Sequence, residues 1–122
     1  MRSLKKIILF LCSFLLSISL YGCDTNTTAN IIDGKLDIIC NYPSTSSNPY
    51  DYIKDSHDFD DIVNMGNKAL TYMLEKFKNS KKNGLEEYIM AIACSKILKE
   101  NPEKKNWNSG KEWYENYINK IS

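Results

Sequence analysis

Apolar positions recur at helical spacing through most of the second half of the chain. Over residues 67–79 they fall one, three and four residues apart, which is typical of a helix with one buried face. Residues 85–98 carry apolar side chains on more than one face, so we expect this helix to be central and buried on two sides. A last helix over residues 109–121 is indicated by Trp113, Tyr117 and Ile121.

Residues that favour helix starts and stops bound these segments. Starts are indicated by Asn48 before Pro49, by Ser56, by Asn83 with Glu86, and by Ser109 with Glu112. Gly66 and the pair Asn101–Pro102 indicate stops. The pattern predicts an all-α fold, a small bundle of four to five helices, with the helical domain over residues 48–122.

The N-terminus carries a different pattern. Basic residues within 2–6 precede an apolar run over residues 7–20, and these 14 residues are fewer than the roughly 20 that a spanning helix needs. A short apolar run behind a basic start is typical of a secretory signal that is cleaved off.

Leu20-Tyr21-Gly22-Cys23 follows this run and resembles the lipobox of bacterial lipoproteins, with Tyr21 where a small residue is usual. The resemblance implies a signal peptide over residues 1–22 and a diacylglyceryl thioether on Cys23, with fatty acids such as palmitate as the anchor. It also implies a location on the extracytoplasmic face of the cell membrane. The alternatives are an ordinary secretory signal or an uncleaved anchor.

Residues 23–47 are expected to form a lipidated tether and a docking segment. The polar stretch 24–30 is typical of a flexible spacer. In the apolar stretch 31–40, Asp33–Gly34 is a turn signal that would allow a small hairpin. We favour the alternative, in which this stretch docks on the helices through its isoleucines.

Residues 60–98 resemble one HEAT-type helical hairpin, with small residues Ala91, Ala93 and Cys94 where the second helix would pack closely. The order of segments, from "SSNPYDYIK" through "GLEEYIMAIAC" to "GKEWYENYI", is similar to a helical domain of uncharacterised Gram-positive lipoproteins and membrane sensor proteins. That resemblance implies a surface-located accessory domain and no activity.

Charge and motifs exclude several classes of function. Residues 23–122 hold 13 lysines against 15 acids, a net charge of −2, so we expect no nucleic-acid partner. His57 is the only histidine, and no metal-binding spacing surrounds it, so no metal or cofactor is expected. The acids of residues 51–61 lack the central glycine of a calcium loop and favour a helix start instead. The sequence shows no pattern of a nucleophile and a base that would indicate an enzyme.

Cys40 and Cys94 leave two alternatives open. Outside the membrane they could form a disulfide that joins the docking segment to the central helix. Cys94 lies in an apolar helix pattern, where a free cysteine packs as a small hydrophobic residue.

An aromatic cluster near the C-terminus is the candidate partner or ligand surface: Trp107, Trp113, Tyr114 and Tyr117. Trp113 and Tyr117, four residues apart, are expected to pack the last helix on the core, leaving Trp107 and Tyr114 exposed. The leading hypothesis is a non-enzymatic protein-interaction module that meets an envelope protein or membrane sensor in a groove beside the last helix. The alternative is a glycan or small-ligand binder that uses Trp107 and Tyr114 as a stacking platform, and a hydrolase has least support.

Overall fold

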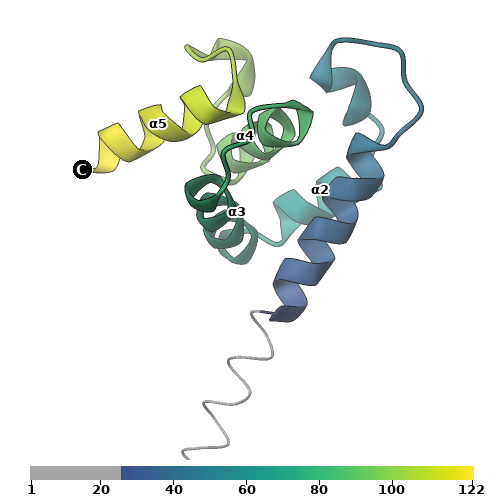
Figure 1. Cartoon of the computed structure of the whole chain (residues 1–122), viewed down its shortest axis with the longest axis horizontal. Coiled ribbons are helices and arrows are strands. Elements are labelled where there is room, and N and C mark those ends of the chain that lie inside the picture. The colour runs from purple at the N-terminus through teal and green to yellow at the C-terminus, as the bar shows by residue number, and fades with distance from the viewer. Residues whose placement is uncertain (1–25) are drawn as a thin grey trace, which may run out of the picture.

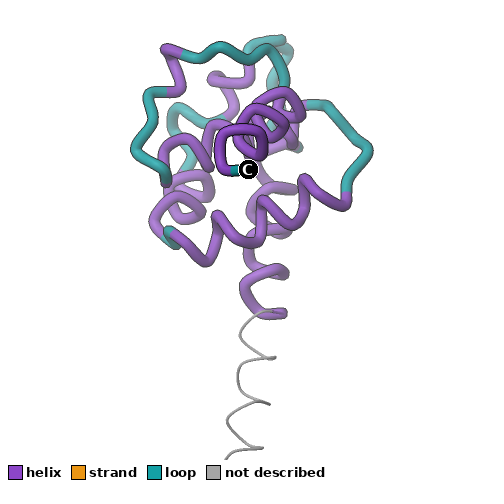
Figure 2. The backbone as a smooth tube through the Cα atoms, turned by 90° about the vertical axis from the view of Figure 1, so that its left-hand side faces the viewer, coloured by secondary structure: helices purple, strands orange, loops and turns teal. Residues whose placement is uncertain are grey.

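The computed structural model describes residues 26–122, and the predicted signal peptide and Cys23 lie outside the described residues. Within that range the chain is helical and contains no strand, which confirms the predicted all-α class (Figures 1 and 2). A helix over residues 26–40 is followed by the elements η1 (Pro49–Tyr52), α2 (His57–Asn64), α3 (Asn67–Asn79), α4 (Leu85–Ile97), η2 (Pro102–Lys104) and α5 (Gly110–Ile121). Over the described residues, no helix combines the length and the apolar character that crossing a membrane requires.

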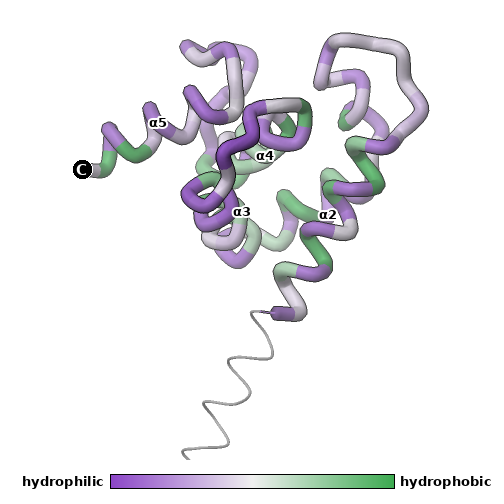
Figure 3. Tube along the Cα trace, viewed as in Figure 1, coloured by the Kyte–Doolittle hydropathy of each residue, from purple (hydrophilic) through white to green (hydrophobic). Residues whose placement is uncertain are grey.

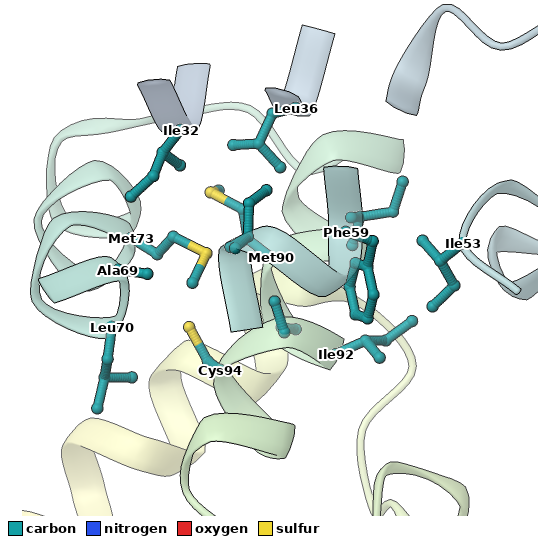
Figure 4. Close-up of a cluster of buried hydrophobic side chains, with 14 of the residues drawn as sticks. Ile32, Leu36, Ile53, Phe59, Ala69, Leu70, Met73, Met90, Ile92 and Cys94 are labelled. Carbon is teal, nitrogen blue, oxygen red and sulfur yellow. The ribbon is translucent and has the colours of Figure 1, made fainter. Parts of the chain in front are cut away.

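Helix α4 is the centre of the bundle, as its apolar pattern predicts. It packs against α2, α3 and α5 and also touches both short 3-10 helices, η1 and η2. Ile89, Met90, Ala91, Ile92, Ala93 and Cys94 form an uninterrupted buried run along it. Figure 4 shows Met90, Ile92 and Cys94 of α4 among side chains from the surrounding helices. A helix that is apolar on every face requires neighbours all round, and the bundle supplies them.

The first helix corrects the prediction for residues 26–40, which lie within the predicted tether and docking segment of residues 23–47. Residues 26–40 are neither a flexible spacer nor a hairpin: they form a helix that buries Ile32, Leu36 and Ile39, which are 0%, 1% and 2% exposed. These residues follow helical spacing and join the same core as the other helices. Gly34 lies within this helix, because burial of its apolar face outweighs the low helix propensity of one glycine.

This helix therefore belongs to the domain. Within the described residues the helical body already includes residues 26–40, so a start near Asn48 is placed too late. The favoured alternative for residues 31–40, docking through isoleucines, agrees with the structure. Figure 3 shows apolar and polar residues interspersed along the helix, as expected for a segment with one face on the core and one face in solvent.

A polar network fixes the first helix to its neighbours. The Lys76 ammonium of α3 lies 2.7 Å from a carboxylate oxygen of Asp33 and 2.7 Å from one of Glu86 in α4, so three helices are joined at Lys76. The Tyr72 hydroxyl donates a hydrogen bond of 2.6 Å to the other Asp33 oxygen. Lys35 of the first helix pairs with Asp58 and Asp61 of α2.

The same contacts shift the pKa values of these groups. Partial burial opposes the ionisation of Asp33, but the hydrogen bonds from Lys76 and Tyr72 and the charge of Lys76 outweigh it, so its pKa is lowered. For Tyr72, burial and the hydrogen bond to the Asp33 carboxylate raise the pKa to about 12. Burial opposes the charge of Lys76, yet its two carboxylate partners leave its pKa raised.

The lowered pKa of Asp33 predicts a pH-dependent contribution to stability. A depressed folded-state pKa contributes stability above the ordinary value of 3.8, and this contribution is lost as the pH falls through the folded-state pKa. We expect Asp33→Asn to lower the free energy of unfolding near neutral pH, with a gap from wild type that closes in acid. Urea unfolding of both proteins across that range measures the gap. A gap that stays constant down to acid would contradict the assignment.

The ends of the helices agree with the predicted caps at most positions. Asn48 and Ser56 accept hydrogen bonds from the backbone N–H groups of Tyr50 and Phe59, both at 3.1 Å. Gly66 adopts the left-handed conformation, with φ of 63°, that lets the chain turn between α2 and α3.

The predicted capping box at Asn83 and Glu86 is wrong by one residue. Helix α4 begins at Leu85, and the Glu87 carboxylate accepts from the backbone N–H of Gly84 at 3.3 Å. Asn83 instead accepts from the backbone N–H of Lys111 at 3.2 Å, while Glu86 pairs with Lys76. Both residues are drawn away from the cap because tertiary partners compete for their side chains.

Candidate functional site

A groove of about 790 Å³ lies where the C-terminal part of α4, the η2 loop and α5 meet. Its lining is rich in side-chain amides and ammonium groups, with three aromatic rings among them. The lining residues are Ser95, Glu100, Asn101, Lys104, Lys105, Asn106, Trp107, Trp113, Asn116, Tyr117, Asn119 and Lys120. The groove lies beside the last helix, where the sequence places the candidate aromatic surface.

Cation–π contacts hold the wall that the η2 loop forms. The Lys105 ammonium lies 4.4 Å from the ring centre of Tyr88, 4.8 Å from Trp107 and 5.9 Å from Tyr50. The rings of Tyr88 and Trp107 are themselves 5.0 Å apart. A cation over several rings is held by the negative charge of their faces. One lysine therefore fixes the loop on η1 and α4.

Helix α5 forms the other wall and is anchored by Trp113. This side chain is 3% exposed, and its ring stacks on Tyr117 at 5.4 Å and lies 5.7 Å from Phe77 of α3. The start of α5 approaches α4 so closely at Gly110 that an added Cβ would lie 2.2 Å from the carbonyl oxygen of Glu87. Only glycine permits this approach.

The four predicted aromatic residues do not share one surface. Trp113 and Tyr117 pack α5 on the body and line the groove. Trp107 also lines it, but it is 5% exposed, so the prediction that it is an exposed ring is wrong. Tyr114 is half-buried and stacks on Phe77 at 5.3 Å, outside the groove. Trp107 belongs to the buried core, where it packs beside Tyr88 with the Lys105 ammonium over its ring, contacts that sequence spacing does not reveal.

Sequence reasoning missed Ser95. This residue is 1% exposed, lies in the last turns of α4 and lines the groove. Its hydroxyl oxygen is buried and has no hydrogen-bond partner among the described residues. A hydroxyl in this state costs roughly 1–3 kcal/mol of desolvation. The sequence could not signal it, because a serine within a helix usually bonds a carbonyl one turn back or faces water.

The acidic stretch around His57 has structural partners. Ser56 caps α2, and Asp58 and Asp61 pair with Lys35 of the first helix. Among the described residues, no group of three or more potential metal ligands gathers. A smaller hollow of about 280 Å³ lies beside this stretch, bordered by Ile38 and Tyr42. These acids therefore fix the first helix to α2 and favour the start of α2.

Cys40 and Cys94 are both free thiols in the structure, Cys94 buried and Cys40 half-buried. Burial, followed by the nearby charges of Glu86, Glu87 and Asp37, raises the pKa of Cys40 to about 11. Burial is also the main cause that raises the pKa of Cys94. Neither thiol is activated as a nucleophile or metal ligand.

These thiols predict a simple labelling result. Alkylation in denaturant without reductant should modify both Cys40 and Cys94, because both are free. In the folded protein at neutral pH, Cys94 should resist alkylation because it is buried and protonated. Peptide mass spectrometry counts the alkylated cysteines. If Cys40 and Cys94 became alkylated only after a reductant was added, they would be joined in a disulfide.

No protein family, no curated protein and no solved structure matches this chain. Side-chain amides donate and accept hydrogen bonds, and ammonium groups attract anions. Such a lining is suited to holding a polar ligand.

Proposed function

We propose that the protein is a membrane-anchored extracytoplasmic lipoprotein that acts as a non-enzymatic protein-interaction module. Cys23 carries the diacylglyceryl anchor, and the groove between η2 and α5 binds an envelope protein. The observation that carries this proposal is the groove itself, with amides and ammonium groups along its lining and a buried hydroxyl that lacks a partner among the described residues.

The placement of the groove supports this role. The N-terminal end of the first helix lies at one end of the body, and the segment between α4 and α5, which contains η2, lies at the opposite end (Figure 1). An anchor at Cys23 would hold the first helix toward the membrane and direct the groove away from it. A partner could then reach the groove without meeting the bilayer.

The groove does not favour the glycan alternative. A stacking platform needs open aromatic faces, whereas Trp107 is 5% exposed and Tyr114 is stacked on Phe77. The buried and stacked rings therefore favour the protein-interaction module over a glycan binder.

The anchor is tested by Cys23→Ala with Cys12→Ala as the matched control. Metabolic labelling with a clickable palmitate analogue and detergent phase partition report lipidation and membrane attachment. We expect Cys23→Ala to lose the label and leave the detergent phase, and Cys12→Ala to keep both. Membrane attachment of Cys23→Ala would show an uncleaved anchor and contradict the lipoprotein assignment.

The partner is tested by photo-crosslinking in living cells. A crosslinkable residue replaces Asn116, which is exposed and lines the groove, and the control replaces its neighbour Glu115, which is exposed outside it. A discrete protein adduct from position 116 and none from position 115 is expected. Equal adducts at positions 116 and 115 would reject the groove as a protein-binding site. The same conclusion would follow if neither position 116 nor a second groove position, 106, gave an adduct.

A further inference from the structure

The lining of the groove carries a net positive charge. Lys104, Lys105 and Lys120 line it with one acid, Glu100, a net charge of +2, whereas residues 23–122 as a whole have 13 lysines against 15 acids. The side chain of Lys120 is 78% exposed and Lys104 is exposed, so both ammonium groups can turn toward a ligand. A local positive charge selects anionic ligands.

The other polar groups of the groove match a polypeptide backbone. Asn106, Asn116 and Asn119 are exposed along its walls, two of them on α5. Each amide side chain offers donors and an acceptor together, the complement of a peptide group. The hydroxyl of Ser95, buried without a partner among the described residues, offers one more contact at the groove.

We propose that the groove binds an acidic, extended polypeptide segment of its partner. Carboxylates of the segment pair with Lys104 and Lys120, its backbone bonds the asparagine amides, and one of its polar groups reaches the hydroxyl of Ser95. This inference rests on the proposed function and names the chemistry of the partner. Trp107 and Trp113, the only two tryptophans in the chain, both line the groove, so their fluorescence reports binding there.

The test is a fluorescence titration of the full-length protein, purified in an uncharged detergent, with capped ten-residue peptides. One peptide alternates Glu and Ser, and the matched peptide alternates Gln and Ser. We expect the acidic peptide to shift the tryptophan emission with an affinity that falls as salt is added, and the neutral peptide to bind at least about tenfold more weakly. Equal binding of the two peptides would overturn the proposal.

Paired variants locate the charge that is recognised. Lys104→Gln with Lys120→Gln should weaken binding of the acidic peptide about three- to tenfold, the range expected for two exposed ion pairs. Lys68→Gln with Lys111→Gln changes the net charge equally at exposed positions outside the groove and should leave the affinity unchanged. An equal loss in both pairs would show non-specific attraction and overturn the proposal.

Two further measurements separate the remaining outcomes. Ser95→Ala should weaken peptide binding about two- to tenfold while raising the unfolding temperature of the free protein, since it removes an unpaired buried hydroxyl. Unchanged binding would overturn the contact with Ser95.

The second measurement is a titration with a polyuronate. Tighter binding of the polyuronate than of the acidic peptide would overturn the peptide proposal in favour of an anionic glycan. If the acidic peptide does not bind but photo-crosslinking gives a specific protein adduct at position 116, only the acidic chemistry of the partner is rejected. If that adduct is absent, the proposed function is rejected.

Discussion

Gly110→Ala should lower the free energy of unfolding by about 2 kcal/mol, the middle of the range for forcing an extra methyl group into a packed site. An alanine Cβ at this position would lie 2.2 Å from the carbonyl oxygen of Glu87 and 2.8 Å from the backbone nitrogen of Tyr88. These are backbone atoms of α4, so α5 must move as a whole. Urea unfolding measures the loss, and the tryptophan emission should report a disturbed groove because α5 forms one of its walls.

Gly34→Ala is the matched control for this variant. Gly34 is exposed within the first helix, and nothing lies within 4 Å of the position that an added Cβ would occupy. Alanine is preferred over glycine in a helix by roughly 1 kcal/mol, so this variant should be more stable than wild type. The same substitution is thus expected to have opposite signs at two positions. Destabilisation at Gly34 would contradict the helix over residues 26–40, and a neutral effect at Gly110 would contradict the close approach of α5 to α4.

Leu36→Ala should destabilise the protein by about 2–5 kcal/mol, as large-to-small substitutions in a packed core do. Leu36 is 1% exposed and belongs to the core that α2, α3 and α4 share with the first helix (Figure 4). If residues 26–40 were a tether, truncating Leu36 would leave the unfolding of the domain unchanged. Chemical unfolding followed by circular dichroism distinguishes the two cases.

Ile38→Ala provides the comparison on the same helix. Ile38 is 60% exposed, so truncating it should change the unfolding free energy by less than about 0.5 kcal/mol. A similar loss from both variants would mean that the effect comes from helix propensity alone. A large loss at Leu36 with little change at Ile38 would establish that one face of the helix is buried in the core.

The sequence predicts the later helices better than the first one. Residues 67–98 show long helical periodicity, and the boundary signals at Ser56 and Gly66 act through local backbone contacts, so pattern and structure agree. Residues 31–40 are a short apolar run that contains Asp33–Gly34, and such a run fits several structures until its packing partners are known. The outcome there depends on Leu36 meeting a core made by residues far along the chain.

For the candidate site too, local patterns are predictable from the sequence and tertiary contacts are not. Its location beside the last helix can be predicted because Trp113 and Tyr117 mark the buried face of that helix. The residues that line it cannot be predicted, because Trp107 packs into the core beside Tyr88 and Tyr114 stacks on Phe77 of another helix. The unpaired hydroxyl of Ser95 is a property of the packed bundle and leaves no trace in the order of residues.

The early start of the first helix limits how far the proposed lipoprotein can reach. The helix is already formed at residue 26, three residues after Cys23, and three extended residues span at most about 11 Å. A lipid on Cys23 would therefore hold the body by a connection shorter than the first helix, whose residues 26–40 rise roughly 22 Å. The groove could sweep only a thin layer above the bilayer, so its partner must bring its binding segment into that layer. Encounters would then be searches in two dimensions, in which confinement to a surface raises the effective concentration of each partner.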